Sequence, residues 1–70
     1  MHAINKLNKQ LRAERKYLEA YNQVYREAGK PIPSQLPRPH VVTPDEAPIH
    51  RAAMAAGERA YRAELQRASR

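Results

Sequence analysis

The sequence predicts an all-α protein in which two helices are joined by an extended proline-rich strap, as an open or loosely folded-back hairpin. Residues 1–29 carry apolar side chains at helical spacing. Residues 30–44 contain five of the six prolines, and residues 45–70 are rich in alanine and arginine. Because proline lacks an amide donor and fixes φ, residues 30–44 should form neither a helix nor a central strand.

The first segment, residues 1–29, is predicted to be an amphipathic helix with a seven-residue repeat. Gly29 suits the left-handed residue that follows a helix end, and Pro31 comes soon after it. Such a repeat is typical of a helix that packs along another helix. With Glu14 as its one polar member, this heptad stripe has spacings of three and four and consists of Ile4, Leu7, Leu11, Leu18, Tyr21, Tyr25 and Ala28.

The strap, residues 30–44, should be stiff, because the residue before each proline is pushed to extended geometry. Its composition differs from that of a flexible Gly/Ser linker. No two prolines are separated by two residues, so the usual pattern of an SH3 ligand is absent. Its apolar side chains indicate that the strap lies on a surface; they are Ile32, Leu36, Val41 and Val42.

The second helix, residues 45–70, has two competing start signals. Thr43 and Glu46 match a capping box, but Pro48 would then fall past the first turn. With Asp45 as the cap, Pro48 takes the third helical position, where a missing amide costs nothing. We therefore favour Asp45, with Thr43 in a separate turn.

One face of this second helix carries apolar and small residues, namely Met54, Tyr61, Leu65 and Ala68. Gly57 lies in the same row and costs up to about 1 kcal/mol relative to alanine. The close approach of another backbone would explain a glycine there.

The chain has too few bulky apolar residues to fold strongly alone. It lacks Cys, Phe and Trp, so disulfides are excluded, and a core of this size seldom supplies more than about 3–5 kcal/mol. The apolar face of the second helix is too narrow to cover the apolar face of the first helix. We therefore predict docking onto protein subunits of a larger complex or a homo-oligomer, through Ile4, Leu7, Leu11, Tyr17, Leu18, Tyr21, Val24, Tyr25, Ile32, Leu36, Met54, Tyr61 and Leu65.

The net charge of +6 and the pI of about 10.2 favour acidic partners. Nucleic acid is the alternative partner, contacted through Lys6, Lys9, Arg12, Arg15, Lys16, Arg59 and Arg62. Acidic residues are interleaved with these cations, however, whereas a dedicated DNA-binding protein shows a cleaner basic stripe. A solvated helix face is the simpler interpretation.

The sequence shows no catalytic motif. We therefore expect a protein that is not an enzyme and that has no cofactor, metal or small-molecule substrate. The three histidines lie in three different segments, and no HExxH motif or Gly-rich phosphate loop occurs. Glu46 and His50 lie one turn apart, but two ligands are weak evidence for a metal site.

The expected function is that of a small structural or adaptor protein, for instance a component of a phage or bacterial particle. A small helical inhibitor or regulator of a host enzyme is a further alternative. No membrane span and no signal peptide are expected, so we expect the protein in the bacterial cytoplasm or within a virion.

Overall fold

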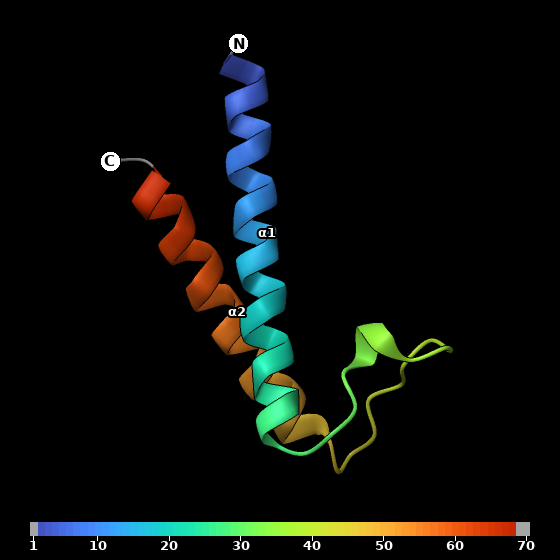
Figure 1. The fold of residues 1–70 in the computed structure, drawn as a ribbon. Helices are drawn as coiled ribbons and strands as arrows, with labels where there is room; N and C mark the ends of the chain where they lie inside the picture. The colour runs from blue at the N-terminus through green and yellow to red at the C-terminus, as the bar shows by residue number, and fades with distance from the viewer. Residues whose placement is uncertain (1, 69–70) are drawn as a thin grey trace.

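The computed structural model confirms the all-helical prediction (Figure 1). It describes the backbone of residues 2–68 and the side chains of residues 6–67. Helix α1 (His2–Glu27) is followed by a single 3-10 turn, η1 (Pro33–Gln35), and by helix α2 (Ala47–Ala68), and the described residues form no strand. The strap folds the chain back, so that α2 runs antiparallel to α1. The two helices are closest at the strap end and diverge towards the termini (Figure 1).

Helix α1 ends as its sequence predicts. Gly29 has a φ of 71°, in the left-handed region. The Lys30 amide donates to the Tyr25 carbonyl at 3.0 Å, and the Gly29 amide donates to the Arg26 carbonyl at 3.1 Å. This pair of hydrogen bonds is the Schellman motif, which satisfies carbonyls that the helix end would otherwise leave unpaired.

The strap is not extended throughout, because η1 interrupts it. The Gln35 amide donates to the Ile32 carbonyl at 3.0 Å, and the Leu36 amide donates to the Pro33 carbonyl at 3.2 Å. Pro33 occupies the first position of the turn, where its missing amide removes no hydrogen bond. The predicted exclusion of helix from residues 30–44 therefore fails at this single turn.

The cap position of helix α2 falls at Glu46, one residue later than Asp45, which we expected to cap it. The Glu46 carbonyl accepts from the His50 amide at 2.8 Å and so opens the helix. Pro48 consequently takes the second helical position. The separate turn at Thr43 is present, because the Glu46 amide donates to the Thr43 carbonyl at 3.0 Å.

Above the strap end, the two helices meet through small residues rather than through the leucines of the heptad stripe. Ala13 of α1 and Ala53 of α2 are fully buried. Gly57 lies against the Tyr17 ring, and a Cβ at this position would come within 2.8–2.9 Å of three ring atoms. A close neighbour therefore explains Gly57, but it is an aromatic ring and not the backbone that we expected.

Candidate protein-docking site

The heptad stripe divides into a lower part near the strap, whose side chains are covered, and an upper part nearer the N-terminus, whose side chains are exposed. Towards the strap, Tyr25 is fully buried and Tyr21 is half-buried. Above them, Leu7, Leu11 and Leu18 are 56%, 50% and 52% exposed. The described part of the chain therefore leaves three leucines of its most regular helix face largely uncovered.

The strap and the start of α2 cover the lower part. The His40 ring packs edge-on against the Tyr25 ring, with their centroids 6.3 Å apart. The Tyr21 hydroxyl and His50 Nδ1 form a hydrogen bond of 3.0 Å. Ile32 of the strap is buried as well. These contacts are absent higher on α1 because the strap lies beside only its lower portion (Figure 1).

Helix α2 adds a second apolar row on the same side of the hairpin. His50, Met54, Tyr61 and Leu65 follow one another at spacings of four and seven, and therefore share one line along the helix. The hydrogen bond between Tyr21 and His50 joins the lower ends of the two rows. We call the residues above that bond the apolar side; they are Leu7, Leu11 and Leu18 of α1 and Met54, Tyr61 and Leu65 of α2.

An open groove lies between Tyr17 of α1 and the Tyr61 region of α2. It has a volume of about 340 Å³ and is lined by Tyr17, Glu58, Tyr61 and Arg62. Met54 is 40% exposed, whereas Tyr61 and Leu65 are half-buried. The apolar side thus combines exposed leucines on α1 with a shallow hollow lined by two tyrosines and by the ion pair of Glu58 and Arg62.

The remaining residues predicted to bind a partner take different places. Val24 is half-buried, and Ile32 lies in the small core with Tyr25, so these residues serve internal packing. Leu36 is exposed on the strap. The side chain of Ile4 lies outside the described part. The prediction omitted Val41 and Val42, which are exposed and could have been found from their position between the strap prolines.

A hydrogen bond between two side chains joins the end of the strap to the start of α2. His40 Nε2 lies 2.7 Å from Glu46 Oε2, and both side chains are largely buried. Glu46 therefore pairs with His40, while His50 pairs with Tyr21. Among residues 6–67 no three His, Asp or Glu side chains gather to hold a metal ion.

The basic residues do not form one stripe. Arg12 and Arg67 both pair with the buried Glu64, at 4.0 Å and 3.3 Å. Lys16 pairs with Glu19 at 3.7 Å.

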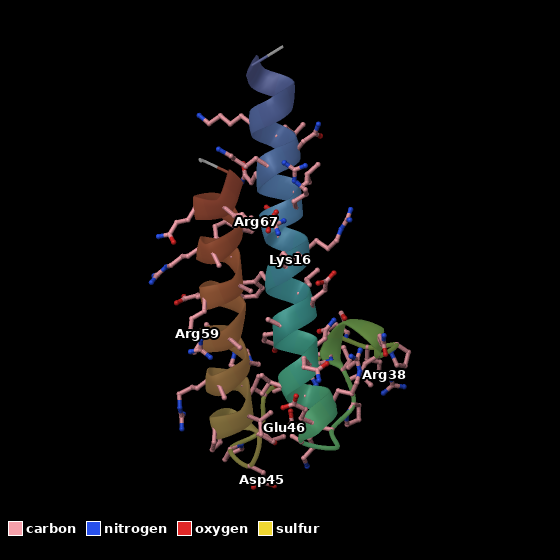
Figure 2. All side chains as sticks on the ribbon, turned by 60° about the vertical axis from the view of Figure 1, so that its left-hand side comes forward. Lys16, Arg38, Asp45, Glu46, Arg59 and Arg67 are labelled. Carbon is pink, nitrogen blue, oxygen red and sulfur yellow. The ribbon has the colours of Figure 1, made fainter. Side chains whose placement is uncertain are left out.

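A further ion pair joins Arg62 to Glu58 at 3.9 Å. Lys9 is half-buried, whereas Lys6, Arg15 and Arg59 are exposed. Lys6 and Arg15 lie nine residues apart, which places them on opposite sides of α1. Figure 2 shows Lys16, Arg59 and Arg67 along the helices and the acidic Asp45 and Glu46 at the strap end.

The buried position of Tyr21 predicts a loss of stability at alkaline pH. Burial raises the pKa of the Tyr21 phenol above its ordinary value of 10.0. The unfolded chain therefore releases this proton first, and the free energy of unfolding falls as the pH rises above that value. Urea unfolding at increasing pH should show this fall in the wild type and a shallower one in Tyr21→Phe. Equal slopes in the two proteins would contradict the assignment.

In the part of the chain that the structure describes, neither helix offers an apolar stretch of the length that a bilayer requires. A comparison with protein-family models, with curated proteins and with solved structures found no match.

Proposed function

We propose that the protein is a small structural or adaptor protein that docks onto other protein subunits through its apolar side. The exposure of Leu7, Leu11 and Leu18 is the observation that carries this proposal. The chain has few large apolar residues, yet three of them are exposed on one face of α1. Helix α2 packs against the neighbouring face of α1 and leaves these three uncovered. Contiguous exposed apolar surface of this kind marks protein-interaction sites.

The size of the core supports the same function. Among the described residues, only Ala13, Tyr25, Ile32 and Ala53 form the buried apolar core. Two of these are alanines, which bury little surface. Proteins with cores this small are usually stabilised by disulfides, metals or association. Because cysteine is absent, association is the route that fits the chain.

The distribution of charge does not favour nucleic acid over protein. Arg12, Lys16 and Arg62 are already paired with acidic residues of the same chain. Lys6 and Arg15 point away from each other. Among the described residues, the cations predicted to contact nucleic acid therefore do not all lie on one face, and we place the docking function on the apolar side.

Replacing Leu11 and Leu18 with aspartate should abolish assembly without unfolding the hairpin. Both side chains are half exposed, so their loss removes little internal packing. Each new carboxylate would have to be buried unpaired in the docked state, which is strongly unfavourable. Sedimentation of cell extracts from the native source should show the wild type in a large complex and the variant in fractions near 8.0 kDa.

The matched control carries Asn8→Asp and Gln66→Asp, which change the net charge by the same amount at exposed positions off the apolar side. This control should sediment like the wild type, and circular dichroism should show equal helicity in all three proteins. Assembly of the double leucine variant at the wild-type level would contradict the proposal. The stoichiometry of the complex then separates a structural subunit, present in many fixed copies, from a regulator.

A further inference from the structure

The second half of the strap leaves a run of backbone groups unpaired. Within the described strap, the amides of residues 40–43 form the longest consecutive run without a backbone hydrogen bond. The first half differs, because η1 pairs the amides of Gln35 and Leu36. Residues 39–43 form neither helix nor turn, and Figure 1 shows the strap standing out to one side of the helices. The backbone of residues 40–43 is therefore accessible to another chain.

This run has the composition of a β-strand. Three of its four residues are β-branched, which favours strands over helices; they are Val41, Val42 and Thr43. Pro39 precedes the run and Pro44 follows it. Each proline fixes its own φ, and Pro44 also pushes the residue before it to extended geometry. The sequence thus favours a short extended segment at this place in the strap.

The side chains of the run alternate between the hairpin and the solvent. The His40 side chain is largely buried, with Nε2 2.7 Å from Glu46 Oε2. Val41 is 78% exposed, Val42 is only 36% exposed, and Thr43 is exposed again. Side chains that point alternately to two faces are characteristic of a strand.

Both ends of the run are held in place within the chain itself. At one end, the His40 ring packs edge-on against the Tyr25 ring. At the other end, the Thr43 carbonyl accepts from the Glu46 amide at 3.0 Å. A segment that is already fixed loses little conformational freedom on binding. The run is therefore better prepared to pair with another chain than a flexible loop would be.

The hydrogen bond of the Thr43 carbonyl also indicates which edge of the run is free. In a strand, the amide and carbonyl of one residue point to the same edge, and those of the next residue point to the opposite edge. The edge shared by Val41 and Thr43 is therefore partly used by the turn that follows. The backbone groups of His40 and Val42 are expected to point to the other edge, where the described backbone offers them no partner.

We propose that residues 40–43 add as a strand to the free edge of a β-sheet in a partner subunit. The hydrogen-bonding groups identify this partner, because a sheet edge presents donors and acceptors at the spacing that an extended segment requires. Unpaired sheet edges accept such segments from other chains. This inference rests on the proposed docking function, and it adds to the apolar side a second contact with a partner surface of stated structure.

Hydrogen exchange in the complex from the native source tests the proposal. Residue-resolved mass spectrometry would compare the amides of Val41 and Val42 in the isolated wild type and in the complex. Both should exchange quickly in the isolated chain, since neither has a backbone partner there. In the complex, exchange at Val42 should slow by about a hundredfold or more, and exchange at Val41 should stay fast. Unchanged exchange at Val42, or equal slowing at both residues, would overturn the inference.

Two single proline substitutions provide a matched pair of variants. Val42→Pro removes an amide that should donate to the partner. Val41→Pro removes an amide on the other edge, where an edge strand tolerates proline. Neither amide makes a backbone hydrogen bond within the chain, so both variants should keep the helicity of the wild type in circular dichroism. Each variant is produced together with the wild type in the native source, and mass spectrometry measures the ratio of the two chains in the complex.

Val42→Pro should enter the complex about tenfold less than the wild type, because it leaves a carbonyl of the partner strand unpaired. Val41→Pro should enter like the wild type. Val42→Ala keeps the amide and should be lost much less than Val42→Pro. Equal entry of the two proline variants would overturn the inference. An equal loss in Val42→Ala and Val42→Pro would also overturn it, because the side chain and not the backbone would then make the contact.

The two proposals can fail separately. If Leu11→Asp with Leu18→Asp leaves the complex while Val42→Pro enters it like the wild type, the strand pairing is rejected and the docking function is kept. If neither set of changes alters the complex, both proposals are wrong.

Discussion

Replacing Tyr25 with alanine is expected to unfold the hairpin. Tyr25 is the largest fully buried side chain among the described residues, and the His40 ring of the strap packs against it. Truncating a buried aromatic side chain typically costs about 3–5 kcal/mol. This loss is as large as the whole stability expected of a core this small. Thermal unfolding followed by circular dichroism should therefore lose its cooperative transition.

The control for this prediction is Val41→Ala, which shortens an apolar side chain that is 78% exposed. It should melt like the wild type. A Tyr25→Ala variant that retains the wild-type transition would show that the strap contributes little to the fold.

Removing only the Tyr25 hydroxyl should have the opposite effect. This hydroxyl is buried and has no hydrogen-bond partner of good geometry among the described residues, although the neighbouring Tyr21 hydroxyl interacts with it. Burying an unpaired hydroxyl costs about 1–3 kcal/mol on mutational scales, so Tyr25→Phe should raise the free energy of unfolding. Tyr21→Phe loses the hydrogen bond to His50 and should lower it by about 0.5–1.5 kcal/mol. Urea unfolding measures the free energy of unfolding of both variants. A decrease in both would contradict the claim that the Tyr25 hydroxyl destabilises the fold.

The second large effect is expected at Gly57, where Gly57→Val should destabilise the helix pair. A Cβ alone would come within 2.8–2.9 Å of the Tyr17 ring, and valine adds two methyl groups to it. Overpacking of this kind costs about 1–3 kcal/mol. Urea unfolding of the variant and the wild type measures the difference.

Two further variants separate the clash from helix propensity. Ala55→Val lies on the exposed side of the same helix and carries only the propensity cost of a β-branched residue. In a chain that also carries Tyr17→Ala, Gly57→Val should cost less, because the ring is gone. An equal cost in both backgrounds would show that Tyr17 does not determine the requirement for glycine.

The helix boundaries could be predicted because local chemistry determines them. Gly29 and Pro31 end α1 through backbone geometry alone. The start of α2 was harder to predict, since Thr43 and Asp45 both suit the cap position, whereas the helix begins directly after Glu46. The pairing of Glu46 with His40 is a contact with the strap, which spacing within the helix does not reveal.

The sequence did not indicate which face of each helix forms the contact between them. The residues on these faces are small, so they do not stand out as an apolar pattern. Ala13, Ala53 and Gly57 face the partner helix, while the leucines of the heptad stripe face away from it. A pattern analysis weights leucine above alanine and so identifies the stripe as the contact surface. Small residues allow the helices to approach closely, and this close packing leaves the larger side chains on the apolar side.

The exposed leucines were nevertheless predicted to need a partner. That prediction rested on the mismatch between the broad apolar face of the first helix and the narrow one of the second. In the structure, Leu7, Leu11 and Leu18 are the part of the apolar face of the first helix that stays exposed.

Sedimentation of the protein in extracts of its native source tests this account most directly. If the apolar side docks onto other protein subunits, the wild type should sediment in a complex much larger than one chain of 8.0 kDa. The variant with Leu11→Asp and Leu18→Asp should sediment as a single chain and keep the helicity of the wild type. A wild type that sediments near 8.0 kDa, or a variant that stays in the complex, would contradict the account.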